Sequence, residues 1–379
     1  MPHCNKQMIS FFLTTKCNLC CEYCYNQEER TRIKEHTLPL EIAKAGIDWY
    51  FANNASRHIR FYGPGEPMIE FELLKNIVEY AHSIGGDAVT TEIQTNGIFG
   101  EKERKWCLNN FNIIWMSFDG LPEIQNKYRP LNRIYEFKFS NKTSAEIIED
   151  NVRWLNNNAE GRNIMVGARV TMTDENIKQQ KEMVDYFHNL GIRYVWTNPL
   201  FHTVGHIPVN DDPQKKKEYK FDMDEYLKHY LNAYRYANVK GMFWGSFLTI
   251  NFDGESTYHC RACTPTPHLT PDGYLSACDM VLLGEAAYHM NPFIYGKWNT
   301  QNKTFDLFND KVKALNERKT ENISHCKNCE ARLQCGGYCL GEVLNETGRL
   351  DGQKPESCIA IKKLLKKLGK SEPYKFLHP

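Results

Sequence analysis

Cysteines at close, regular spacing are the residues of this chain best suited to chemistry. The chain has 14 cysteines, and Cys17, Cys21 and Cys24 follow the pattern C-x3-C-x2-C near the N-terminus. Thiolates this close together on one loop can hold an iron–sulfur cluster. Three thiolates are one too few for a closed four-ligand site. A cluster held in this way leaves one iron open, and an open iron can bind and reduce a small molecule.

A second run of cysteines occupies the C-terminal third of the chain. Its members are Cys260, Cys263, Cys278, Cys326, Cys329, Cys335, Cys339 and Cys358. This number of thiolates suffices for two closed four-ligand sites. C-x2-C pairs also bind zinc, and cysteine-rich secreted chains form disulfides. The grouped spacing in a long chain without a secretory signal favours iron–sulfur clusters over both alternatives.

The bulk composition describes an ordinary globular protein. The chain has 379 residues, of which 41% are hydrophobic and 25% charged, enough for two domains. A formal net charge of +1 gives no basic field for nucleic acid. No apolar run of about 18 residues exists to span a membrane, and the N-terminus has no signal-peptide pattern. We therefore predict a cytoplasmic protein with neither nucleic acid nor membrane as a partner.

Strand-like and helix-like segments alternate over the first 200 residues. The predicted strands, rich in β-branched and aromatic residues, are Met8–Thr14, His58–Tyr62, Ala88–Thr95, Asn112–Phe118, Ile164–Met172 and Tyr194–Leu200. Six such repeats predict a parallel sheet with outer helices, short of the eight that close a full barrel. The predicted fold class is α/β, with an open, partial (β/α)6 TIM-like barrel.

Later elements are less regular. Asp174 is a plausible N-cap for the helix after the fifth strand. A long helix is expected over Asp222–Val239, and a strand over Phe243–Phe252. The cysteine-rich character begins soon afterwards. We therefore predict a barrel domain over residues 1–240 and a cysteine-rich domain over residues 241–379.

The polar motifs follow the ends of the predicted strands. The cysteine loop follows the first strand, Gly63–Pro67 the second and Thr95–Gly97 the third, while Ser117–Gly120 closes the fourth. In folds of this class the chemistry lies at the carboxyl ends of the strands. The motifs therefore fall where an active site is expected.

The loop sequence CNLCCEYC resembles the signature of the radical S-adenosylmethionine (SAM) enzymes, and the later motifs occur in that family's order. The resemblance implies that SAM chelates the open iron through its amino and carboxylate groups. An electron from the cluster then cleaves the C5′–S bond, and the 5′-deoxyadenosyl radical removes a hydrogen atom from the substrate. The cofactor supplies this chemistry, and the protein positions and shields it.

The same resemblance implies a set of cofactor-binding residues: Tyr23, Gly65, Glu66, Pro67, Asn96, Ser117, Asp119 and Arg169. Tyr23 would lie beside the adenine, and the Gly-Glu-Pro loop would meet the SAM ammonium group. Ser117 and Asp119 would lie near the ribose and the carboxylate, with which Arg169 would pair. Pro64 departs from the pattern, because many members have glycine there.

The second run of cysteines resembles the SPASM domain, which carries two auxiliary 4Fe-4S clusters. By this resemblance, Cys260, Cys263, Cys278 and Cys339 would bind the inner cluster, although the tight spacing leaves open whether Cys260 ligates. The outer cluster would be bound by Cys326, Cys329, Cys335 and Cys358. The expected cofactors are thus three 4Fe-4S clusters and SAM.

Asp279 directly follows Cys278. The resemblance implies that it is a general base that deprotonates the substrate. The alternative is an aspartate that caps a loop after a strand. Both interpretations remain open at the level of sequence.

Four functions fit this chain. The favoured one is a radical SAM oxidoreductase that modifies a ribosomally made peptide by oxidation, cross-linking or epimerisation. Anaerobic sulfatase maturation, which forms formylglycine from Cys or Ser, is the second, and dehydrogenation of a small molecule is the third. A non-enzymatic electron carrier is the fourth. The expected partners are a peptide or protein substrate, a separate leader-binding protein and a reductant of the flavodoxin or ferredoxin type.

Overall fold

A computed structural model describes residues 7–26, 33–139, 141–200 and 221–369. The chain forms two compact units that interleave along the sequence. The first unit comprises residues 1–16, 29–93 and 248–379, and the second comprises residues 17–28 and 94–247. Each unit is described separately.

The first unit contains a mixed sheet whose strands come from the N-terminal and the C-terminal parts of the chain. β1 (Ile9–Phe11) pairs in parallel with β2 (His58–Phe61), and β2 pairs in parallel with β3 (Thr90–Thr95). The other edge of β1 pairs in parallel with β8 (His268–Leu269). β9 (Tyr274–Ser276), β10 (Ile294–Asn299) and β11 (Thr304–Leu307) continue in antiparallel order.

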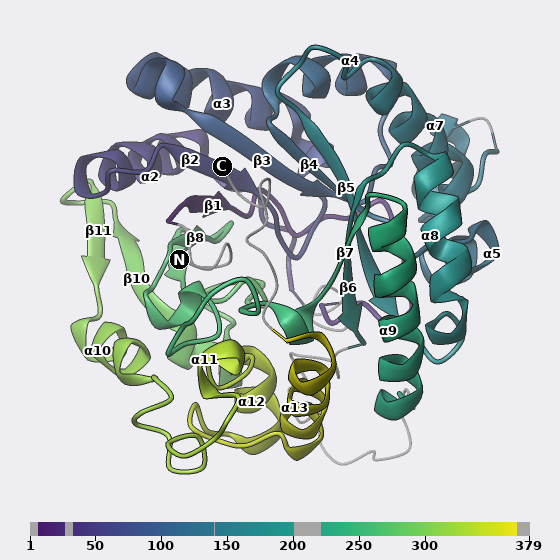
Figure 1. Cartoon of the computed structure of the whole chain (residues 1–379). Coiled ribbons are helices and arrows are strands. Elements are labelled where there is room, and N and C mark those ends of the chain that lie inside the picture. The colour runs from purple at the N-terminus through teal and green to yellow at the C-terminus, as the bar shows by residue number, and fades with distance from the viewer. Residues whose placement is uncertain (1–6, 27–32, 140, 201–220, 370–379) are drawn as a thin grey trace. The chain divides into compact units, whose positions relative to one another are not determined.

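Helices α2 (Leu40–Asn53) and α3 (Phe71–Gly85) pack against each other beside β1 and β2 in the first unit (Figure 1). In α3, Leu74, Ile77, Val78 and Ala81 are buried, as their helical spacing predicts. Four helices follow the sheet near the C-terminus: α10 (Asn309–Glu317), α11 (Arg332–Cys335), α12 (Leu340–Thr347) and α13 (Pro355–Leu368).

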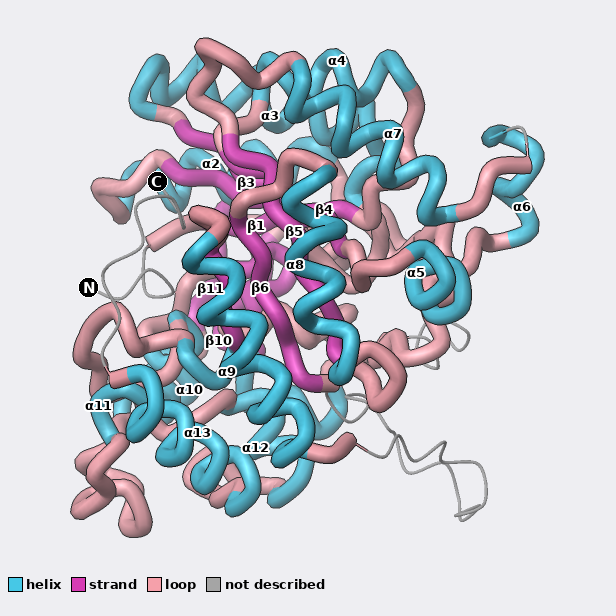
Figure 2. The backbone as a smooth tube through the Cα atoms, turned by 45° about the vertical axis from the view of Figure 1, so that its right-hand side comes forward, coloured by secondary structure: helices cyan, strands magenta, loops and turns pink. Residues whose placement is uncertain are grey.

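The second unit is built on parallel strands. β4 (Ile113–Ser117), β5 (Met165–Met172), β6 (Tyr194–Pro199) and β7 (Phe243–Ser246) pair in this order, each parallel to the next. The helices of this unit are α4 (Glu101–Asn110), α5 (Pro122–Tyr128), α6 (Arg133–Glu136), α7 (Ser144–Asn157), α8 (Gln180–Asn189) and α9 (Met223–Val239). Figure 2 shows α8 and α9 side by side along β6.

All six predicted strands are present and shorter than expected, most of all the first, which was expected over Met8–Thr14 and covers Ile9–Phe11. The helix over residues 222–239 is also present, and the Asp222 side chain caps it by accepting a hydrogen bond from the Glu225 N–H. The Asp174 cap was wrong. Asn176 instead accepts a hydrogen bond from the Thr173 N–H, and a 3-10 turn over Ile177–Gln179 delays the start of α8.

The strand expected over residues 243–252 ends at Ser246, where a 3-10 turn begins. β7 extends the parallel sheet beside β6. Within the described ranges, none of the helices has both the length and the apolar character needed to cross a membrane. The proposed division at residue 240 stays a prediction.

Candidate active site and cysteine groups

Cys17, Cys21 and Cys24 lie on one loop of the second unit. The loop packs among buried apolar side chains, including Leu19, Ile98 and Tyr128. Burial raises the pKa of the Cys21 thiol, and negative charge on Cys17 and Cys24 raises it further. The three thiols are therefore close enough for their charges to interact. Such a set is costly to ionise alone, and a cationic iron core would relieve that cost.

Asparagine side chains brace this loop. The Asn96 amide donates to Oδ1 of Asn18 at 2.6 Å and lies 3.9 Å from Sγ of Cys17, while Asn18 donates to the Ile98 carbonyl at 3.0 Å. Asn26 is only 1% exposed, and its amide makes no hydrogen bond within the described residues. A buried amide of this kind is a fitting partner for a polar ligand.

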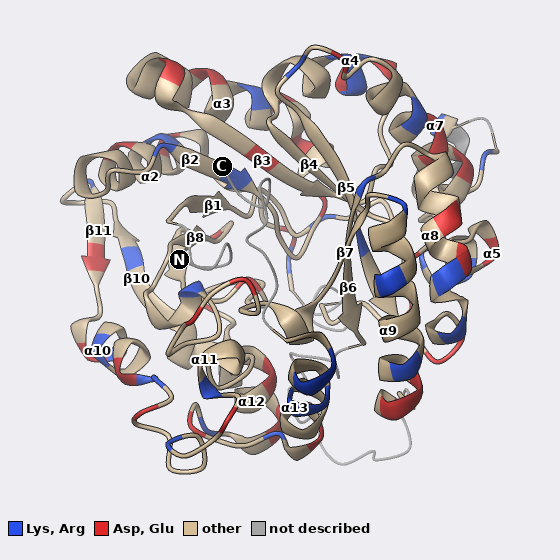
Figure 3. Ribbon diagram, viewed as in Figure 1, with Lys and Arg blue, Asp and Glu red and all other residues tan. Residues whose placement is uncertain are grey.

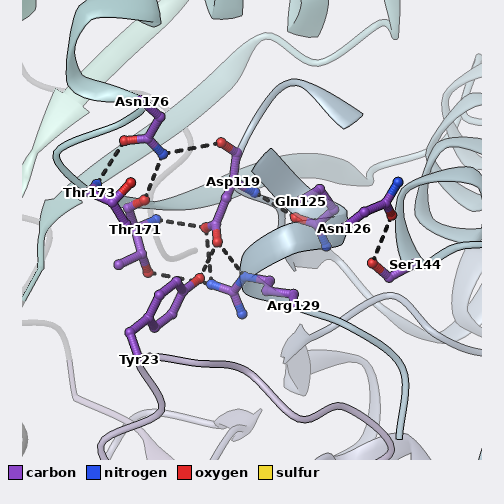
Figure 4. A network of polar contacts seen from close by, with 9 residues as sticks. All are labelled: Tyr23, Asp119, Gln125, Asn126, Arg129, Ser144, Thr171, Thr173 and Asn176. Carbon is purple, nitrogen blue, oxygen red and sulfur yellow. Dashed lines mark hydrogen bonds and ion pairs between the residues drawn. The ribbon is translucent and has the colours of Figure 1, made fainter. Parts of the chain in front are cut away.

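Asp119 is the centre of a buried polar network (Figure 4). Arg129 binds it through Nε at 2.8 Å and Nη2 at 3.1 Å, and the Thr171 N–H donates to it at 2.9 Å. The Tyr23 hydroxyl also donates to this carboxylate. The carboxylate therefore fixes the position of the Tyr23 ring, two residues beyond Cys21.

Arg129 was not predicted from the sequence as a site residue. Its guanidinium lies 5.2 Å from the centre of the Tyr23 ring, as well as pairing with Asp119. It stands directly after α5, where no spacing or motif marks it. The Asp119 carboxylate is only 1% exposed, and the Arg129 cation neutralises it. The main role of Arg129 is therefore this ion pair.

Ser117 and Arg169 are neighbours across the sheet of the second unit. Ser117 on β4 is directly opposite Arg169 on β5. The Arg169 guanidinium lies over the ring of Trp115 at 4.9 Å and the ring of Trp196 at 5.9 Å. The register thus brings two of the predicted SAM-binding residues together, and their roles stay predictions.

The Gly-Glu-Pro loop lies in the first unit. A Cβ on Gly65 would come within 2.2 Å of the Thr14 carbonyl oxygen and 2.6 Å of the Lys16 carbonyl oxygen, so only glycine fits. The Glu66 N–H donates to that Lys16 carbonyl at 2.8 Å. The Glu66 carboxylate caps the 3-10 turn that starts at Pro67 by accepting from the Met68 N–H at 3.0 Å.

The predicted inner ligands form one electrostatic group in the first unit. Burial raises the pKa of the Cys278 thiol, and negative charge on Asp279, Cys339 and Cys260 raises it further. Burial also raises the pKa of the Cys263 thiol, and negative charge on Cys260 raises it further. Cys260 interacts with the other members in this way, which supports its inclusion in the set.

A glycine lies close to this inner group. A Cβ on Gly341 would lie 2.6 Å from the Met280 sulfur and 3.4 Å from Sγ of Cys278. A larger residue at position 341 would crowd the thiolate. The absence of a side chain there leaves room beside the predicted ligand.

The predicted outer ligands line one cavity: Cys326, Cys329, Cys335 and Cys358. Burial raises the pKa of the Cys326 thiol to about 11 and that of the Cys335 thiol to about 12, with smaller contributions from the other members. Cys358 stands on α13, the lysine-rich helix in Figure 3. Cationic side chains next to a set of thiolates favour an anionic cluster there.

Every cysteine in the described part of the chain is a free thiol. Among those same residues, no three His, Cys, Asp or Glu side chains are arranged to hold a single metal ion. The assignment of clusters to the two C-terminal groups therefore depends on which cysteines interact with one another and on the cavity that the outer four line. That these cysteines bind clusters stays a prediction.

Asp279 lies beside the inner group, with 39% of its side chain exposed. Its Oδ2 is 3.5 Å from Nη2 of Arg60. Arg60 in turn lies 3.9 Å from the Glu92 carboxylate, which meets His58 at 3.1 Å. The sequence reasoning missed Arg60, Glu92 and His58. One feature of the sequence could have indicated them: charged residues occur on two neighbouring strands, in which Arg60 and Glu92 are paired.

Comparison with known proteins agrees with this arrangement. Residues 7–133 match the family described as 4Fe-4S single cluster domain. The chain is 25% identical over 374 residues to the serine-type anaerobic sulfatase-maturating enzyme of Bacteroides thetaiotaomicron, a match that covers 89% of this chain and 82% of that enzyme.

Other curated relatives are matched over a smaller share. An uncharacterized protein of Methanocaldococcus jannaschii and the Fe-coproporphyrin III synthase of Methanosarcina barkeri are 25% and 28% identical. The matches span 59% and 47% of those proteins' own length. The activity and substrates of such relatives are therefore not carried over whole.

Two solved structures share the fold. The first is anSMEcpe with bound AdoMet, with a TM-score of 0.71 at 17% identity, over 95% of this chain and 96% of that chain. The second is SuiB of Streptococcus suis bound to its precursor peptide SuiA, with a TM-score of 0.66 at 15% identity, over 94% of this chain and 76% of that chain.

The chain thus has the α/β fold of the radical SAM enzymes, with parallel strands, a mixed sheet and an additional C-terminal domain, as predicted. The chain is thus similar to serine-type anaerobic sulfatase-maturating enzymes over most of its length, and its N-terminal third matches a 4Fe-4S single cluster domain.

Proposed function

We propose that this protein is a radical SAM oxidoreductase that modifies a peptide, with three 4Fe-4S clusters and SAM as cofactors. The observation that carries the proposal is the separation of the cysteines into three groups. One group has three members and the other two have four each. A set with a vacant ligand position suits substrate chemistry, and closed sets suit electron transfer.

When bound, the SAM-loaded cluster supplies a 5′-deoxyadenosyl radical that removes a hydrogen atom from the substrate. Cys17, Cys21 and Cys24 would hold that cluster, and the predicted SAM-binding residues would orient the cofactor. The Asp119–Arg129 pair holds the Tyr23 ring in place. These groups bind and orient, and they exchange no proton in the proposed reaction.

Asp279 is the proposed general base. Arg60 holds its Oδ2, so the carboxylate is oriented beside the inner cysteine group. Its side chain is partly exposed, so a substrate can reach it. This carboxylate would take up the proton that an oxidised substrate loses, and the inner cluster, when bound, would supply the electron acceptor for that oxidation.

One experiment tests this function. The triple variant Cys17→Ala/Cys21→Ala/Cys24→Ala, incubated anaerobically with SAM and dithionite, is expected to form no 5′-deoxyadenosine. Its iron content should fall from about twelve to about eight atoms per chain, because four atoms belong to each cluster. SAM cleavage in this variant, or a wild-type protein with zinc in place of the auxiliary iron, would contradict the proposal.

Sulfatase maturation is the second candidate. The identity of 25% over 374 residues to a serine-type sulfatase-maturating enzyme favours it. Co-expression with a candidate precursor peptide, or with a sulfatase fragment that contains the target serine, distinguishes the two. A product that reacts with a hydrazide is an aldehyde and supports formylglycine. A product that has lost hydrogen without gaining an aldehyde supports peptide modification.

A further inference from the structure

The two C-terminal cysteine groups are joined by an unusually constrained turn. Cys335 belongs to the outer group and Cys339 to the inner one. Between them, Gly336, Gly337 and Tyr338 all have positive φ, at 61°, 85° and 66°. A Cβ on Gly336 would lie 2.2 Å from the Tyr258 carbonyl carbon, so this residue cannot carry a side chain. The turn is therefore fixed by close backbone packing on both sides.

Arg318, directly after α10, holds this turn. Its Nη1 donates to the Gly336 carbonyl at 3.2 Å, its Nη2 to the Gly337 carbonyl at 2.7 Å and its Nε to the Leu350 carbonyl at 2.9 Å. The residue is 4% exposed. The guanidinium therefore lies under the peptide segment that connects an outer ligand to an inner one.

The Arg318 charge has no carboxylate partner in the described part of the chain. The positive charge of Arg318 helps to lower the pKa of Asp351, but that carboxylate pairs with Arg349. A buried cation without an anion is costly. The turn that Arg318 binds has a cysteine at each end, Cys335 and Cys339. These cysteines become anionic when they hold a cluster.

Two of the carbonyl groups that Arg318 binds lie between ligands of both groups. Gly336 directly follows Cys335 of the outer group, and Gly337 stands two residues before Cys339 of the inner group. One side chain thus lies next to both sets.

We propose that Arg318 is a fixed positive charge shared by the two auxiliary clusters and raises the reduction potential of both. This inference rests on the proposed function only in requiring that both cysteine groups hold clusters. Reduction adds one negative charge to a cluster that is already anionic with four thiolates. A fixed cation stabilises the reduced form more than the oxidised form, and net charge near a cluster is one of the factors that set its potential. Arg318 is thus a positioning residue that also makes each auxiliary cluster a better electron acceptor.

The test is a redox titration followed by electron paramagnetic resonance. The background is the Cys17→Ala/Cys21→Ala/Cys24→Ala variant, so that only auxiliary clusters contribute. Arg318→Gln removes the charge and keeps an N–H donor on a shorter side chain, whereas Arg318→Lys keeps the charge. We expect Gln to lower the ratio of reduced to oxidised cluster at least tenfold at a fixed potential, a shift of about 59 mV for one electron. The Lys variant should stay much closer to the unmodified background.

Arg349→Gln is the matched control, because this arginine is 71% exposed and pairs with Asp351. It should leave both potentials unchanged. Equal potentials in the Gln variant and the background, at equal iron content, would overturn the proposal. If the Gln variant binds no iron, Arg318→His replaces it. Its potentials should fall more steeply than those of the background as pH rises and the imidazole loses its charge, and equal slopes would overturn the proposal. A background protein without auxiliary iron would instead refute the cluster assignment of the proposed function.

Discussion

Arg129 binds both carboxylate oxygens of Asp119, with Nε 2.8 Å from Oδ2 and Nη2 3.1 Å from Oδ1. The side chains are 12% and 1% exposed, so this bidentate pair is shielded from water. The same carboxylate accepts a hydrogen bond from the Tyr23 hydroxyl, one residue before Cys24. The position of the cysteine loop is thus coupled to the end of β4.

Breaking this pair from one side should be strongly destabilising. Arg129→Met leaves Asp119 buried and uncompensated, and we expect a loss of about 3–5 kcal/mol in the free energy of unfolding. Urea denaturation measures it. Arg349→Met, which breaks an exposed pair, should cost no more than about 1 kcal/mol. The double variant Asp119→Asn/Arg129→Met should recover part of the loss. Equal effects of the two arginine variants would contradict the argument.

Replacement of the proposed base should separate two activities. Asp279→Asn cannot take up the substrate proton, so turnover of the peptide should fall by about a hundredfold or more. SAM cleavage without substrate should continue, because Asp279 is not among the residues proposed to hold SAM. Product is measured by mass spectrometry and 5′-deoxyadenosine by chromatography. Asp310→Asn, an exposed change on α10, is the control. Full turnover in Asp279→Asn would remove the base assignment.

Acid should destabilise the first unit through His268. Burial lowers the pKa of this imidazole to about 3 from an ordinary value of 6.5, a shift that the charge of Asp279 opposes. The folded state therefore favours the neutral ring. Its contribution to stability is complete above pH 6.5 and is lost as pH falls toward 3, by roughly 1.4 kcal/mol per pH unit.

His268→Phe should flatten this pH dependence. A phenyl ring can retain the stacking on Phe12, whose ring centre lies 5.4 Å from that of His268. It also removes Nδ1, which has no hydrogen-bond partner within the described ranges. Unfolding free energies at pH 7, 6 and 5 are compared between variant and wild type, since loss of clusters in acid affects both. Parallel curves would mean that His268 does not control acid stability.

Gly65→Ala should displace the Gly-Glu-Pro loop. Its Cβ would meet the backbone oxygens of Thr14 and Lys16, which cannot move as a side chain does. We expect a loss of about 1–3 kcal/mol in stability and weaker SAM binding, measured by denaturation and by equilibrium dialysis. Gly241→Asn serves as the control, because nothing lies within 4 Å of a Cβ there and Asn tolerates its φ of 67°. Undiminished SAM binding in Gly65→Ala would argue against a role for this loop.

Local patterns in the sequence were enough to predict much of this molecule. Runs such as Ile9–Phe11 and Met165–Met172 are rich in β-branched or apolar residues, so the parallel strands were recognisable. Cysteine spacing likewise marked the loop of Cys17, Cys21 and Cys24, because ligands of one cluster must be near each other. The charge of Cys260 acts on the Cys339 thiol across 78 intervening residues, a relationship that only the resemblance had suggested.

Pairings made in three dimensions had no such signal. Arg129, Arg60 and Arg318 act through partners on other elements, and a single arginine in a sequence is usually a surface residue. The wrong cap at Asp174 has a local cause, since the Asn176 side chain accepts from the Thr173 N–H and a 3-10 turn over Ile177–Gln179 precedes α8. Short polar side chains near one another make helix starts ambiguous.

The pairing of β1 with β8 has a consequence for biosynthesis. Ser10 donates its N–H to the Pro267 carbonyl at 2.8 Å, and Phe12 donates to the Leu269 carbonyl at 2.9 Å. During translation, one edge of β1 must wait for a partner made more than 250 residues later. An unpaired edge invites association with other chains, and contacts this distant in sequence form slowly. We expect chains that stop before residue 268 to aggregate, because β1 then never acquires its partner β8.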